Sequence, residues 1–296
     1  MHLYGELAAL ITALFWSMTS IAFTEASVRV GPIYVNVTRM IIALFCLAVT
    51  LLALKIEIVL SWHQTFNLVI SGFVGLVIGD SFLFKAFKNI GARISMLIMA
   101  LVPPISALLA FFYLGERLSF LGVFGIVITI SGIALVVLKR KEKPSSNYKK
   151  DYMGIFYAVI GALGQAVGLI FAKHAFNEGE INGFLASFIR IASAVIIIYP
   201  FAVITRIYKE PVKVYKKDKN AFVFTVVGSV FGPFLGITLS MVSITYTKVG
   251  IASTIMATVP ILMLPMVRYY YKEKLSWISI TGAVIAVCGI AILFLH

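Results

Sequence analysis

Asp80 is the side chain in this sequence with the clearest potential for chemistry, because it lies within the apolar run GDSFLFKAF of a predicted membrane span. An ionisable residue inside a span is costly and marks a functional site by default. We expect Asp80 to be either a coupling or substrate-binding carboxylate or the partner of a basic side chain such as Lys85. Arg39 and Arg190 lie inside other predicted spans, where pairing or snorkelling to the interface is favoured over contact with a substrate.

Patterns that mark common enzyme sites are missing from the sequence. It contains no HExxH, P-loop or GxSxG motif, no cysteine pair, and no cluster of acids suited to a metal ion. Cys46 and Cys288 lie singly in apolar runs, as small buried hydrophobic residues do. We therefore predict a protein that is not an enzyme and that needs no metal or other cofactor.

Composition assigns the chain to a lipid bilayer. Of its 296 residues 61% are hydrophobic and 12% are charged, and its mean hydropathy is +1.02, whereas soluble domains have about 25% charged residues. The apolar stretches are long and continuous, as in helices, and they do not alternate as barrel strands do. They predict an all-α integral membrane protein with ten transmembrane helices, near residues 3–23, 32–54, 66–87, 94–114, 120–138, 153–173, 182–205, 221–244, 249–271 and 276–295.

The net charge of +13 lies mainly in short connections between the predicted spans, so it reports topology and not nucleic-acid binding. The odd-numbered connections hold nineteen Lys and Arg residues, and the even-numbered ones hold four. By the positive-inside rule, the basic linker 139–151 lies in the cytoplasm and both termini lie outside the cell membrane. The partners we expect are the bilayer and a small-molecule substrate, with no nucleic acid, for a multi-pass monomer or homodimer.

The two halves of the sequence resemble each other at a separation of 157 residues. The phrase LVPPISALLAFFYLGERLS ends at Ser119, and TVPILMLPMVRYYYKEKLS ends at Ser276. A looser separation of 151 residues relates Arg39 to Arg190. We predict two five-helix repeats, 1–138 and 152–296, joined by the linker 139–151. Because five is odd, the second repeat must be inverted in the membrane, which is the architecture of carriers that alternate access to a site near the midplane.

Prolines interrupt both copies of the repeated phrase. Pro103 and Pro260 fall in the middle of predicted spans, where a proline removes one helix hydrogen bond and bends the helix. The carbonyls of Met99 and Met256 then lose their partners. These kinks are therefore candidates either to line a substrate path or to serve helix packing alone.

Each copy then closes with a glutamate and a serine. Glu116 and Glu273 are expected in tight turns at the membrane surface, where a structural role is favoured. Ser119 and Ser276 precede apolar runs and fit N-caps of the helices that follow.

Small residues spaced by four mark the third and eighth predicted spans. They predict a groove for close contact, in which equivalent helices of the two halves approach each other. The glycines in question are Gly75, Gly79, Gly232 and Gly236.

Trp16 and Gln165 occupy similar places in the first and sixth predicted spans, and with Phe84 and Tyr246 they are candidates for the wall of a substrate pocket. The positions that differ between the halves, such as Trp16 against Gln165, are where we expect contact with the cargo. Asp80 is another such position, because Ile237 stands opposite it in the second half.

Together, the doubled proline phrase and the glycine-spaced stretches GVFGIVITISGIALVV and GAVIAVCGIAILF resemble the EamA family of the drug/metabolite transporter superfamily. The resemblance covers both halves. It implies a secondary carrier with a central cavity between the halves, as in family members that export amino acids or other small metabolites. Family members are often described with cytoplasmic termini, whereas the charge count of this chain favours the opposite orientation.

The function we expect is that of a secondary active transporter, an exporter of small metabolites such as amino acids by alternating access, with proton coupling as one option. The alternatives are an uptake carrier or exchanger, a flippase for a lipid-linked group, or a non-transporting membrane scaffold.

Overall fold

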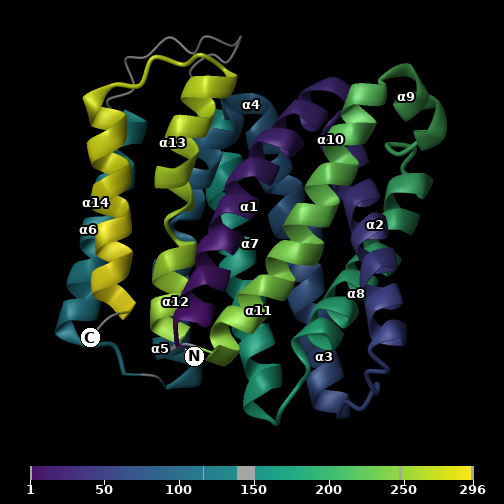
Figure 1. Ribbon diagram of the computed structural model, residues 1–296, viewed down its shortest axis with the longest axis horizontal. Coiled ribbons are helices and arrows are strands. Elements are labelled where there is room, and N and C mark those ends of the chain that lie inside the picture. The colour runs from purple at the N-terminus through teal and green to yellow at the C-terminus, as the bar shows by residue number, and fades with distance from the viewer. Residues whose placement is uncertain (1, 116, 139–150, 247–248, 295–296) are drawn as a thin grey trace.

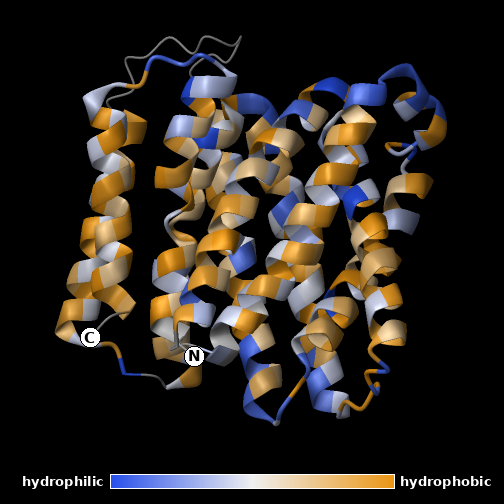
Figure 2. Ribbon diagram, viewed as in Figure 1, coloured by the Kyte–Doolittle hydropathy of each residue, from blue (hydrophilic) through white to orange (hydrophobic). Residues whose placement is uncertain are grey.

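The structure, a computed structural model, describes residues 2–115, 117–138, 151–246 and 249–294. Within these ranges the regular structure is entirely helical. The helices stand side by side and mostly run between the two ends of the molecule (Figure 1). Figure 2 shows hydrophobic residues along the middle of the helices and hydrophilic residues gathered at both ends, as expected for helices in a bilayer.

In chain order the elements are α1 (His2–Val30), α2 (Pro32–Ala53), α3 (Trp62–Ser71), η1 (Gly72–Gly79), α4 (Asp80–Met99), α5 (Val102–Leu114), α6 (Phe120–Leu138), α7 (Tyr152–Asn177), α8 (Gly183–Ile204), α9 (Pro211–Lys217), α10 (Lys219–Ser229), η2 (Val230–Gly236), α11 (Ile237–Tyr246), α12 (Val249–Met256), α13 (Val259–Tyr270) and α14 (Trp277–Phe294). The elements η1 and η2 are π-helical, with wider turns than an α-helix.

Nine helical stretches of the described residues are long and apolar enough to cross a membrane. The predicted span 94–114 is not among them, because it is divided between the end of α4 and the 13-residue helix α5. The division falls at Ala100 and Leu101, which form a turn, whereas Gly91, with φ 79° and ψ 168° in a conformation that favours glycine, interrupts α4 before this span begins. A multi-pass helical protein is therefore established, and the count of ten spans stays a prediction.

The two prolines of the repeated phrase begin helices instead of bending them. Pro103 lies in the first turn of α5 and Pro260 in the first turn of α13, where no N–H group is needed. A short turn interrupts the helical structure just before each of these helices, after Met99 and after Met256. Each predicted span is therefore interrupted near its proline, as expected, but by a turn that begins three positions before the proline and not by a bend at the proline itself.

Helices α6 and α14 form an antiparallel pair at one edge of the molecule (Figure 1). A Cβ atom built on Gly125 would lie 2.6 Å from the Gly289 carbonyl oxygen, and one built on Gly132 would lie 2.5 Å from the Ala286 nitrogen. The pair is therefore packed backbone against backbone, as small residues permit in membranes. Helix α1 begins and α14 ends at the same end of the molecule, the lower one in Figure 1.

Candidate functional site

A cluster of buried charges lies where η1 meets α4. The Asp80 side chain accepts hydrogen bonds from Arg39 of α2 at one carboxylate oxygen and from Gln165 of α7 at the other. Asp80 is 5% exposed and Arg39 is 7% exposed, so the ion pair is shut off from water. We call Asp80, Arg39, Gln165, Asn36 and Arg190 the charge cluster.

Arg39 is held firmly within the charge cluster. Its Nε donates to Asn36 Oδ1 at 3.0 Å, and Asn36 Nδ2 donates to Ser81 Oγ at 3.1 Å. The guanidinium carbon lies 4.6 Å from the ring centre of Phe84 and 5.5 Å from that of Phe23, distances at which an aromatic face stabilises a cation. Arg39 is thus paired, packed and oriented entirely by residues of the first half.

Arg190 of α8 approaches the same place from the second half. A Cβ atom built on Gly75 would lie 3.5 Å from Arg190 Nη2 and 3.7 Å from Gln165 Oε1, so both polar atoms border the space above this glycine. Asp80 and Arg190 interact electrostatically. Arg190 Nε is buried and makes no hydrogen bond to any described residue. The charge cluster therefore contains two guanidinium groups and one carboxylate.

The glycines of η1 allow α7 to reach Asp80. A Cβ on Gly168 would lie 2.9 Å from the Gly75 Cα, and a Cβ on Gly164 would lie 2.7 Å from the Gly79 Cα. Ser71 Oγ also donates to the Gly168 carbonyl oxygen at 2.6 Å. We call this meeting of η1 and α7 the first glycine contact.

A matching contact joins η2 of the second half to α1 of the first. A Cβ on Gly232 would lie 3.3 Å from Thr19 Oγ1, and one on Gly236 would lie 2.5 Å from Trp16 Nε1. We call it the second glycine contact. The groove was expected to join equivalent helices of the two halves. That expectation was wrong for these spans, because each glycine groove instead receives the first helix of the other half.

The remaining candidates for the pocket wall have different surroundings. Phe84 is buried beside Arg39, and Met99 packs against the buried apolar cluster that contains Phe84. Met256 is half-buried at the end of α12. Tyr246 at the end of α11 is 47% exposed, so it does not belong to the buried cluster.

Lys85 is not the partner of Asp80. Its Nζ lies 4.9 Å from the ring centre of Phe82 and 5.6 Å from that of Tyr157. Lys85 therefore interacts with aromatic faces. The expectation that Lys85 pairs with Asp80 was wrong, because Arg39, 41 positions from Asp80 in the chain, forms that ion pair.

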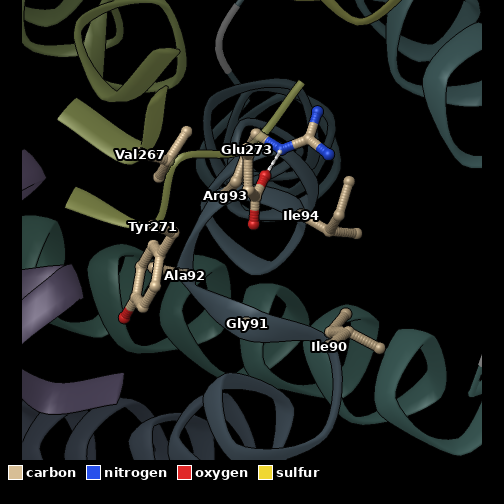
Figure 3. Close-up of a pocket in the computed structure, with 8 residues that line it drawn as sticks. All are labelled: Ile90, Gly91, Ala92, Arg93, Ile94, Val267, Tyr271 and Glu273. Carbon is tan, nitrogen blue, oxygen red and sulfur yellow. Dashed lines mark ion pairs between the residues drawn. The ribbon is translucent and has the colours of Figure 1, made fainter. Parts of the chain in front are cut away.

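A second polar group joins the two halves near the break at Gly91 (Figure 3). Arg93 Nε lies 3.0 Å from Glu273 Oε2, and Arg93 Nη1 donates to Ser279 Oγ at 2.9 Å. The cavity beside this ion pair measures about 10 Å³, which suits a water molecule and not a metabolite. A structural role for Glu273, as expected from its turn, agrees with this geometry, whereas Glu116 lies outside the described residues.

The serine caps predicted from the repeated phrase are confirmed. Ser119 Oγ accepts from the Gly122 N–H at 3.0 Å, and Ser276 Oγ accepts from the Ser279 N–H at 3.2 Å. Three members of the polar groups, Asn36, Arg93 and Ser279, were missed by sequence reasoning. Asn36 precedes Arg39 by three positions on one helix face, a spacing that could have identified it. Arg93 lies just before a predicted span and carries no comparable signal.

Paired ionisable residues enclosed by apolar helices are a feature of membrane proteins that carry a substrate or ion pathway. The model of the EamA-like transporter family matches residues 3–138 and 152–295. The chain therefore belongs to the EamA-like transporter family, which confirms the resemblance drawn from its sequence.

Known proteins similar to this chain include one curated relative and one solved structure. "Uncharacterized transporter YxxF" of Bacillus subtilis (strain 168) is 29% identical over 126 residues, which cover 43% of this chain and 39% of that protein. The match thus spans about two-fifths of the relative's length. A crystal structure at 19% sequence identity matches 98% of this chain and 96% of its own with a TM-score of 0.69, and this likeness concerns the fold alone.

Proposed function

We propose that the protein is a secondary active transporter that exports small metabolites, such as amino acids, by alternating access. In this proposal the chain crosses the cell membrane ten times as two inverted five-helix halves, 1–138 and 152–296. The observation that carries the proposal is the charge cluster, because Asp80 and Arg39 of one half meet Gln165 and Arg190 of the other inside apolar helices. Substrate sites of inverted-repeat carriers lie near the midplane at such an interface.

Helix packing supports the inverted arrangement. The last helices of the two halves, α6 and α14, pack antiparallel through corresponding glycines. The two glycine contacts also correspond, since Gly75 and Gly79 precede Gly232 and Gly236 by 157 positions. Two halves that exchange equivalent contacts are suited to rocking about a shared site.

Counterflow into proteoliposomes tests the transport activity. Vesicles containing the purified protein are loaded with unlabelled amino acids or other small metabolites, and uptake of the labelled compound is followed against protein-free vesicles. We expect at least one compound to accumulate only in the protein-containing vesicles. Absence of flux for every compound would favour the membrane scaffold. Accumulation of a lipid-linked group in the opposite leaflet would favour the flippase.

Direction and coupling require separate measurements. Cells that overproduce an exporter release the substrate faster, whereas an uptake carrier or exchanger raises its internal level. Asp80→Asn tests proton coupling, with Asp80→Glu as the control that keeps the carboxylate. Undiminished pH-driven transport by the Asn variant would remove Asp80 from any coupling step.

Cysteine accessibility tests the proposed orientation. Single cysteines placed in the basic linker 139–151 should resist an impermeant thiol reagent added to intact cells, because the charge count assigns this linker to the cytoplasm. Labelling from outside would show that the chain has the opposite orientation to the one proposed.

A further inference from the structure

The charges of the charge cluster do not balance. Asp80 supplies one negative charge, whereas Arg39 and Arg190 supply two positive charges. An unbalanced charge among membrane helices is costly unless an oppositely charged group joins it. The cluster therefore has the capacity to take up one further negative charge.

The two arginines differ in how their guanidinium groups are satisfied. Arg39 has the carboxylate of Asp80, the amide oxygen of Asn36 and an aromatic face. Arg190 has a buried Nε with no hydrogen-bond partner among the described residues. Ile237 stands 157 positions after Asp80, so the second half has no acid at the position that serves Arg39 in the first. The spare positive charge therefore belongs to Arg190.

Polar atoms of two helices converge beside Gly75. Arg190 Nη2 and Gln165 Oε1 would lie 3.5 Å and 3.7 Å from a Cβ atom built on Gly75, so this glycine leaves room for a single carbon atom beside them. Gln165 Nε2 is directed at Asp80 and at the Gly75 carbonyl oxygen, 3.2 Å away. Arg190 is half-buried, whereas Arg39 and Asp80 are fully buried. It is thus the more accessible cation of the cluster.

We infer that Arg190 binds the anionic group of the transported solute, and that this group is a carboxylate. A guanidinium group recognises carboxylate and phosphate oxygens in the same two-pronged geometry. The cluster lacks a single negative charge, which a carboxylate supplies, whereas a phosphate monoester brings about 1.5 to 2. The inference rests on the proposed transport function and adds to it the chemical class of the cargo.

Matched compounds and matched variants test this assignment. Uptake of the labelled compound found by counterflow is competed with small carboxylic acids, with their carboxamides and with phosphate monoesters of similar size. In the wild type we expect the acid to compete at least tenfold better than its amide. Arg190→Gln should lose that preference at least tenfold, while competition by the amide stays unchanged. Arg190→Lys should keep the preference with a higher KM, because the ammonium group of lysine keeps the positive charge but lacks the two-pronged hydrogen bonding of a guanidinium group.

Thermal unfolding of the purified protein provides a readout that does not depend on transport. The same carboxylic acids should raise the melting temperature of the wild type but not of Arg190→Gln, and the amides should raise neither. If no compound is transported but the acids still stabilise only the wild type, the transport proposal fails and the Arg190 site stands. If Arg190→Gln does not fold, the KM of Arg190→Lys decides instead: a higher KM than in the wild type supports the inference, and an unchanged KM overturns it.

Three results would overturn the inference. An amide that competes as well as its acid in the wild type would remove the carboxylate from recognition. An unchanged preference in Arg190→Gln would assign recognition to another residue. Stronger competition by phosphate monoesters than by carboxylic acids would keep the anion site but replace its ligand.

Discussion

The first and second glycine contacts have the same backbone design and opposite chemistry. In both, a π-helical stretch rich in glycine receives the first helix of the other half. The first contact presents Gln165 to Asp80, whereas the second buries the indole of Trp16 against Gly236. Duplication thus accounts for the shared packing, and the substituted side chains account for the difference in polarity.

This difference indicates that the first glycine contact serves the polar site and that the second serves helix packing. Polar groups that interact with Asp80 gather around the first glycine contact, and aromatic side chains fill the second. A carrier with a single site needs only one polar wall, and the other wall can serve packing. The comparison therefore predicts that equivalent substitutions have unequal effects at the two contacts.

Asp80→Asn should have the largest effect on stability. The variant leaves the buried guanidinium group of Arg39 without its carboxylate, and breaking a buried ion pair costs about 3–5 kcal/mol. Reversible unfolding in mixed micelles measures the loss. Ile237→Val at the corresponding position of the second half is the control and should cost no more than about 1.5 kcal/mol.

A double variant sharpens the same comparison. Replacing Asp80 and Arg39 together by leucine removes both members of the ion pair, so it should restore part of the stability that Asp80→Asn loses. Equal losses from the single and the double variant would show that the ion pair is not the source of the effect.

Gly168→Thr should have the next largest effect. Threonine is the residue that the second contact carries at the corresponding place, Thr19, but a Cβ at position 168 would lie 2.9 Å from the Gly75 Cα. The backbones must separate, at about 1–3 kcal/mol in the free energy of unfolding. Thr19→Ala in the second contact should cost about 1 kcal/mol or less. Equal costs at both positions would contradict the closer approach in the first contact.

Gln165→Leu should have the smallest effect of the three. It removes the hydrogen bonds from Gln165 to Asp80 and to the Gly75 carbonyl oxygen, and hydrogen bonds between membrane helices contribute about 0.6–1.7 kcal/mol. The free energy of unfolding again provides the measurement. Trp16→Phe, which keeps an aromatic ring beside Gly236, is the matched change in the second contact and should cost less.

The sequence predicts those features that depend on neighbouring residues. The predicted spans 120–138 and 182–205 agree with α6 and α8 to within one residue, because hydropathy and capping are local properties. The caps at Ser119 and Ser276 were predicted for the same reason.

Features that depend on tertiary contacts were not predicted. A search along one helix proposes Lys85 as the partner of Asp80, since Lys85 lies little more than a turn away, whereas Arg39 reaches Asp80 only through packing of α2 on α4. The break at Gly91 was missed similarly. A hydropathy profile contains no backbone angles, so it cannot reveal that one residue, Gly91, has a positive φ.

The antiparallel pair of α6 and α14 has a consequence for biosynthesis. Helix α6 ends at Leu138 and α14 begins at Trp277, so all of α7 to α13 is synthesised before the partner of α6. At about 5–20 residues per second, α6 waits in the membrane for roughly seven to thirty seconds with its glycine face covered by lipid or by an insertion factor. A nascent chain arrested before Trp277 should therefore expose this face to crosslinking, and the completed chain should protect it.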